Sequence, residues 1–216
     1  MEKLYIFIMC AGLAVAGYFG YQWWQGSQSV ETISIEESET EAPAEANMAE
    51  AEETQTEDAG SSEPAEQETA PVMSDEVTGY EQGEEMARLE IPKIENAYKT
   101  FWGADDATLK QGVGMYVSEW TTTPDQKRHT VLSGHRDTVF TELGELETGD
   151  MLALEYDGKR YEYEISKTWI TDKDDRTVIV DKDTPTLTLT TCYPLDYLGN
   201  APDRYIIQAE LVSVSE

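Results

Sequence analysis

The stretch Pro185-Thr-Leu-Thr-Leu-Thr-Thr-Cys192 alternates threonine with leucine, which is the period of a β-strand that has one apolar face. Leu187 and Leu189 occupy that apolar face. Cys192 falls on the other face, with the threonines. The sequence therefore predicts a strand that ends in a cysteine on its more polar side.

Similar strand-like runs occur throughout the C-terminal part of the chain. An Asp157-Gly158 pair between two of them is typical of a hairpin turn. The predicted strands cover 87–92, 97–102, 114–120, 129–135, 151–156, 160–171, 186–192 and 204–213.

Two short helices are predicted between these strands. One covers 105–111 and ends at Gly112. The other covers 138–146, with Val139, Leu143 and Leu146 as its apolar face. About eight short strands and two small helices predict a mainly β fold, a closed or nearly closed barrel, over residues 87–216.

The N-terminal residues are of a different kind. Leu4 to Trp24 is apolar apart from Gln22, and its 21 residues would cross a bilayer as a helix. We expect residues 1–24 to form a cytoplasmic stub and an uncleaved transmembrane anchor, with Lys3 favouring an inside N-terminus. A cleaved signal peptide is the competing interpretation. Both place the folded domain outside the cytoplasm.

Residues 25–86 separate this segment from the predicted barrel. Within them, 31–86 contain nineteen acidic residues and no lysine or arginine. So few large apolar residues cannot offset the entropy of ordering, and we predict a disordered acidic linker. The net charge of −29 argues against nucleic acid as a ligand.

Three residues at predicted strand ends could act together in acyl transfer. Cys192 is the only cysteine outside the first ten residues, so it has no disulfide partner within the barrel. His135 closes one predicted strand and Arg204 begins another. They would supply a nucleophile, an acid/base and a cation for an oxyanion. The structural alternatives are a packed core thiol, a structural histidine and an arginine paired with a nearby aspartate.

Other polar residues are assigned structural roles. His129 follows two basic residues and is predicted to be solvated at a strand entry. Arg136 and Asp137 are expected to pair locally or to cap the helix that follows. The aspartates of 172–183 lack an EF-hand pattern, and the histidines and cysteine lack zinc spacing, so no metal or other cofactor is predicted.

The quoted residues resemble those of the sortases, the cysteine transpeptidases of Gram-positive cell surfaces. TLTTC at 188–192 fits the family's T-L-x-T-C signature, and LSGHRDTVF at 132–140 fits its histidine motif. Arg204 falls where the family's arginine belongs. The runs CYPLDYLGNAPDRY at 192–205 and LEIPKI at 89–94 are most similar to the class D branch.

The resemblance implies an eight-stranded sortase-type barrel with His135, Cys192 and Arg204 as catalytic residues. Its substrates would be surface proteins with a C-terminal LPxTG- or LPxTA-like sorting signal. The amine acceptor would be a peptidoglycan precursor or another surface protein. The chain would be a single-pass protein of the cell membrane with an extracellular catalytic domain. A plain cysteine peptidase and a non-catalytic surface binding module remain as alternatives.

Overall fold

The computed structural model describes residues 9, 12–18, 20–21, 30–33, 79–197, 199 and 201–216. The strands are β1 (Val30–Thr32), β2 (Glu85–Ile91), β3 (Asn96–Trp102), β4 (Val113–Met115), β5 (His129–Ser133), β6 (Met151–Tyr156), β7 (Lys159–Asp172), β8 (Thr186–Tyr193) and β9 (Asp203–Ser215). The helical elements between the strands are η1 (Pro92–Ile94), α3 (Asp106–Leu109), η2 (Pro124–Gln126) and η3 (Leu143–Glu145).

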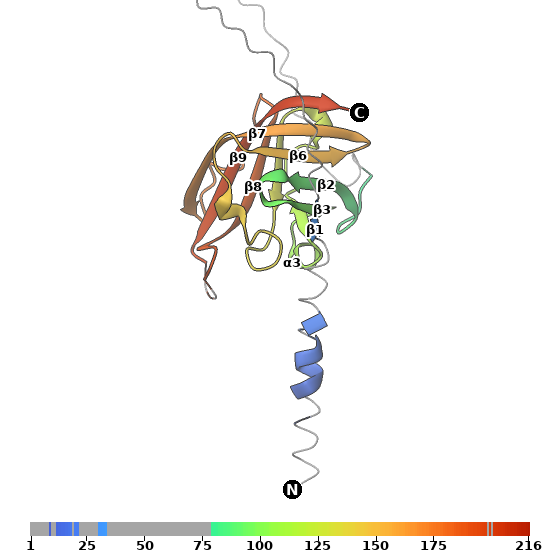
Figure 1. Ribbon diagram of the computed structural model, residues 1–216, viewed down its shortest axis with the longest axis vertical. Coiled ribbons are helices and arrows are strands. Elements are labelled where there is room, and N and C mark those ends of the chain that lie inside the picture. Colours follow the sequence, from blue (N-terminus) through green and yellow to red (C-terminus); the bar gives the residue numbers. More distant parts are fainter. Residues whose placement is uncertain are drawn as a thin grey trace, which may run out of the picture.

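Strands β2 to β9 form a closed eight-stranded barrel. The strand order is β3-β2-β6-β7-β9-β8-β5-β4, and a further β3–β4 pairing closes the ring. The β3–β4 and β5–β8 pairs are parallel, and the other pairs of the ring are antiparallel. The strands curve around a single core (Figure 1).

Apolar side chains that point inward fill this barrel. Leu89 on β2 lies opposite Leu154 on β6. On the other side, Leu189 on β8 lies between Leu132 on β5 and Ile207 on β9. All five side chains are buried. The alternation of leucine and threonine in β8 thus places its leucines in the core, as the sequence predicts.

Each of the eight predicted strands is present, with its ends shifted by a few residues. The largest difference is at 114–120, where β4 stops at Met115. The Thr121 hydroxyl accepts a hydrogen bond from the Ser118 amide at 2.9 Å and donates one to the Tyr116 carbonyl at 2.8 Å. These local bonds hold the chain in a turn and prevent the strand from continuing.

One of the two predicted helices is wrong. The helix at 105–111 is found as the shorter α3, capped by the Asp105 carboxylate on the Ala107 amide. The region 138–146 forms turns and the short η3 instead. The amides of Val139 and Phe140 both donate to the His135 carbonyl, which produces one tight turn without a continuing helical ladder. The apolar residues of this region are buried nevertheless.

Much of the predicted N-terminal anchor and most of the predicted linker lie outside the described residues. The described part of Leu4–Trp24 is helical at 9, 12–18 and 20–21. No helix within the described ranges is both long and apolar enough to span a bilayer.

Strand β1 falls inside the segment 25–86 and pairs with the barrel. Val30 lies opposite Tyr98 and packs against the core, and the Ile33 amide donates to the Glu95 carbonyl at 2.8 Å. β1 and β4 both pair with the same edge of β3. β1 lies opposite the first half of β3, whereas β4 lies opposite its last residues. Residues 30–33 are therefore ordered, although the sequence predicts disorder there.

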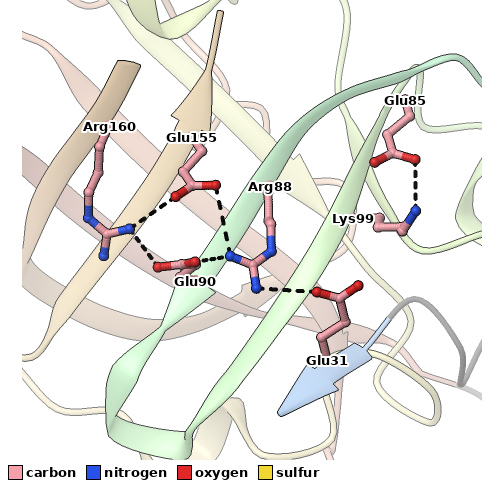
Figure 2. Close-up of polar contacts among 7 residues, drawn as sticks. All are labelled: Glu31, Glu85, Arg88, Glu90, Lys99, Glu155 and Arg160. Carbon is pink, nitrogen blue, oxygen red and sulfur yellow. Dashed lines mark hydrogen bonds and ion pairs between the residues drawn. The ribbon is translucent and has the colours of Figure 1, made fainter. Parts of the chain in front are cut away.

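An ion-pair network on the outer face of the barrel reaches β1 (Figure 2). Glu90, whose side chain is 10% exposed, contacts Arg88 and also pairs with Arg160 at 2.6 Å. Arg88 in turn pairs with Glu31 of β1 at 3.2 Å. The network links β1, β2 and β7, so charge complementarity supports the backbone pairing of β1.

We expect residues 30–33 of the full chain to be protected from hydrogen exchange, because pairing with β3 engages their backbone. Val30→Asp would abolish this protection, since a carboxylate cannot pack against the core without a partner. Hydrogen exchange followed by mass spectrometry measures the effect. The same substitution at Val72, outside the described residues, is the control. Equal exchange of residues 30–33 in both variants would contradict the pairing.

Candidate active site

Cys192 and Arg204 lie directly opposite each other on neighbouring antiparallel strands. Cys192 is the penultimate residue of β8 and Arg204 the second residue of β9. Directly opposed residues project from the same face of a sheet, so the thiol and the guanidinium lie on one side. Both residues are partly exposed, and Cys192 is a free thiol.

The Arg204 side chain is held by the backbone of its own strand entry. Its Nη1 donates to the carbonyls of Asp203 at 2.9 Å and Ala201 at 3.3 Å. Within the described residues it forms no ion pair, so the aspartate partners considered from the sequence are not engaged. The guanidinium keeps further donors beside the cysteine.

His135 is brought to the same end of the barrel by the parallel β5–β8 pairing. Ser133, the last residue of β5, pairs with Thr190. Beyond the end of β5 the chain stays hydrogen-bonded to β8. The Gly134 amide donates to the Thr190 carbonyl at 3.2 Å, and the Thr191 hydroxyl donates to the Gly134 carbonyl at 2.7 Å. His135 therefore leaves the strand beside the residues that lead into Cys192.

Gly134 is required at this point by packing. A Cβ on this residue would lie 2.7 Å from the Phe140 ring and 2.8 Å from Val139. The turn that follows His135 folds back over the glycine, which fixes the direction in which the backbone presents the histidine.

Arg136 has a role that the sequence interpretation missed. It was expected to pair with Asp137 or to cap a helix, but its Nη1 donates to the Pro194 carbonyl at 2.6 Å and its Nη2 to the Gly199 carbonyl at 2.8 Å. Both acceptors lie in the loop between β8 and β9. No sequence signal marks this contact, because it joins residues about sixty positions apart.

The prediction for His129 is also wrong. This residue is fully buried, its Nδ1 lies 2.6 Å from the Val180 carbonyl and its Nε2 lies 2.8 Å from the Thr188 hydroxyl. Burial lowers the pKa of His129 to about 4 from its ordinary value of 6.5. His129 is thus a neutral structural residue that ties the 173–185 connection to β8. The charged neighbours in sequence suggested solvation, and the strand period does place His129 on the face opposite the core residue Leu132, but the 173–185 connection covers that face and buries the side chain.

The described residues contain no cluster of histidine, cysteine, aspartate or glutamate that could hold a metal ion. A cavity of about 650 Å³ between β2, β6 and the start of β7 has none of the three candidate residues in its lining. The chemistry available at the strand ends is that of a thiol, an imidazole and a guanidinium, which suits nucleophilic acyl transfer.

Comparison with known proteins agrees with this chemistry. Residues 89–212 match the family model of the sortase domain. The chain is 38% identical to sortase D of Bacillus subtilis (strain 168) over 210 residues, which are 96% of this chain and 97% of that protein. The catalytic domain of sortase D of B. anthracis is 63% identical, with a TM-score of 0.56 over 62% of this chain and 92% of that one.

A solved structure of Clostridium perfringens sortase C is a more distant relative. It is 26% identical, with a TM-score of 0.56 over 62% of this chain and 74% of that chain. That protein was solved with the C-terminal cell wall sorting motif.

Removal of the buried histidine should change how stability depends on pH. The unfolded chain binds a proton at His129 below about pH 6.5, whereas the folded chain does so only near pH 4. Stability is therefore complete above pH 6.5 and falls as the pH drops towards 4, by about 3 kcal/mol for this residue.

Denaturant unfolding at pH values from 4 to 7 measures this slope. His129→Gln should flatten it, and His135→Ala, the matched control at the other histidine, should retain it. A slope unchanged in His129→Gln would show that other groups cause the pH dependence.

Thr191→Val tests the bond that joins the two strand ends. The substitution preserves shape and leaves the buried Gly134 carbonyl without its donor, which should cost about 1–3 kcal/mol of unfolding free energy. Thr190→Val, at a half-buried hydroxyl on the neighbouring position, is the control and should cost less. Equal losses in the two variants would remove any special role for the Thr191 bond.

Proposed function

Because the chain belongs to the sortase family of cysteine transpeptidases, we propose that it joins surface proteins bearing an LPxTG- or LPxTA-like sorting signal to an amine. The acceptor is an amine of a cell-wall precursor or of another surface protein. The chain is anchored in the cell membrane by residues 1–24, with its N-terminus cytoplasmic and its catalytic domain outside.

The observation that carries this proposal is the pairing of Cys192 with Arg204 beside the end of the strand that leads to His135. Cys192 and Arg204 lie near strand ends and His135 follows the end of β5, all at one edge of the barrel. A core thiol or an isolated structural histidine would not require this convergence.

The proposed reaction proceeds in two acyl transfers. The Cys192 thiol passes its proton to His135 as its sulfur attacks the threonine carbonyl carbon of the sorting signal, and the resulting oxyanion is stabilised by the Arg204 guanidinium. His135 donates a proton to the leaving amine as the peptide bond breaks, which leaves a thioester on Cys192. His135 then accepts a proton from the incoming amine, which attacks the thioester, and passes that proton to the departing Cys192 sulfur, so that the thiol is restored.

Transfer to an amine requires more than these three residues. Water competes for the thioester, so the acceptor amine must be held in position and the access of water limited. If the acceptor is absent, the same site releases the substrate as a free acid. The alternative of a plain cysteine peptidase therefore differs in its acceptor and not in its catalytic residues.

Two kinds of observation support the cellular part of the proposal. Leu4–Trp24 is long and apolar enough to span a bilayer, and little charge accompanies it. The related Clostridium perfringens sortase C was solved with a C-terminal cell wall sorting motif, which makes a similar signal a reasonable substrate class here.

Incubation with a panel of LPxTG- and LPxTA-like peptides, with and without an added amine, tests this function by mass spectrometry. We expect a Cys192 acyl adduct and an amine-linked peptide product. Cys192→Ala should abolish both, because the thioester cannot form without the thiol.

Cys10→Ser, which removes the other cysteine of the chain, is the matched control and should leave both products unchanged. An active Cys192→Ala chain would contradict the assigned nucleophile. A product that is only the free acid, whatever amine is added, would favour the peptidase.

A further inference from the structure

Arg136 is a buried cation bound to backbone carbonyls. The residue is 9% exposed, and its two terminal nitrogens donate to Pro194 at 2.6 Å and to Gly199 at 2.8 Å. Within the described residues it has no carboxylate partner. Its charge is therefore compensated by hydrogen bonds and not by an ion pair.

The two acceptors lie in the segment that joins the proposed nucleophile to the proposed oxyanion ligand. Pro194 is two residues after Cys192, and Gly199 is five residues before Arg204. Arg136 itself directly follows His135. One side chain thus connects the backbone that carries the histidine to the loop that separates the cysteine from the arginine.

Two other contacts between these segments, at Thr191 and Leu195, lie at the β8 end of the β8–β9 loop. The Thr191 hydroxyl bonds to the Gly134 carbonyl before Cys192. Leu195 lies close against Gly144, where an added Cβ would be 2.9 Å from its methyl group. Arg136 also bonds to Gly199, so among the described residues of the loop it holds two positions five residues apart.

The geometry of arginine suits this task better than that of lysine. A guanidinium presents its donors in a planar fork and can hold two carbonyls at fixed separation, whereas an ammonium is a compact charge on a flexible stem. Loss of the fork would leave two carbonyl groups without their donor and release the loop.

We propose that Arg136 is a positioning residue that sets the spacing between His135 and the Cys192–Arg204 pair by fixing the β8–β9 loop. Its two side-chain hydrogen bonds go to the backbone of that loop, so it would act through the loop and not on the substrate itself. This inference rests on the proposed function, because it assumes that His135, Cys192 and Arg204 act on one substrate.

The test compares Arg136→Met and Arg136→Lys with Arg160→Met in the full chain. Arg160→Met is the matched control: it makes the same substitution and removes a partner of the shielded Glu90, but it lies in the outer network near the start of β7. Thermal unfolding measures how much each variant loses in general stability.

The first readout is the rate at which iodoacetamide alkylates Cys192 as a function of pH, with peptide mapping to separate Cys192 from Cys10. It needs no peptide substrate. We expect the Arg136→Met profile to move towards that of the urea-unfolded chain, with Arg136→Lys between it and the wild type. Arg160→Met should retain the wild-type profile.

The second readout is the kinetics with whichever sorting peptide the wild type accepts. Arg136→Met should lower kcat by about 100-fold, the size of effect that a displacement of about 1 Å produces, with a much smaller change in KM. Arg136→Lys should recover part of this loss, because it can still donate to one carbonyl.

Several results would overturn the proposal. One is an alkylation profile and kcat of Arg136→Met that match those of Arg160→Met, which would leave Arg136 a purely structural role. Another is a wild-type profile identical to that of the unfolded chain, since no arrangement around Cys192 would then be present to lose. If Arg136→Met does not fold, Arg136→Lys is judged by the same two readouts.

Failure of the wild type to acylate any peptide counts against the proposed function, while the alkylation profiles still decide the role of Arg136.

Discussion

The parallel pairing of β5 with β8 is the constraint on which the candidate active site depends. It runs from His129 opposite Thr186 to Ser133 opposite Thr190, and it brings both strands to the same end of the barrel. Strand β9 then returns antiparallel to β8 and places Arg204 opposite Cys192. A shift of one residue in either register would turn the cysteine or the arginine to the opposite face.

Buried polar contacts protect this register along its length. His129 bonds to Thr188 near the entry of the two strands, and Thr191 bonds to Gly134 near their exit. Arg136 continues the series beyond the strands by holding the loop that follows Cys192. A buried polar group that loses its partner costs free energy, so these pairs disfavour slipped arrangements that the apolar core alone would tolerate. The core supplies most of the stability, whereas these hydrogen bonds specify the alignment at the site.

The sequence predicts the parts of this structure that depend on local periodicity. Alternation of leucine and threonine is enough to place the core face of β8 and the side on which Cys192 lies, and the same argument finds the other seven barrel strands. It fails at 138–146, because apolar spacing there reflects burial of a turn and not a helix. It also fails for His129 and Arg136, whose partners lie more than fifty residues away in sequence. The acidic composition of 25–86 also led to a prediction of disorder at the short strand β1. Pairing with β3 orders β1, and composition does not show that pairing.

The most direct test of this account is whether the end of β5 lies beside Cys192. His135→Cys in a Cys10→Ser chain leaves two cysteines, and mild oxidation followed by peptide mapping reports whether they bond. Because a disulfide requires Cα atoms within about 7 Å, the account predicts a 135–192 cross-link in the folded chain. His129→Cys, at the opposite end of β5, should form none. Absence of the 135–192 bond, or equal cross-linking in the two variants, would contradict the proposed convergence of the catalytic residues.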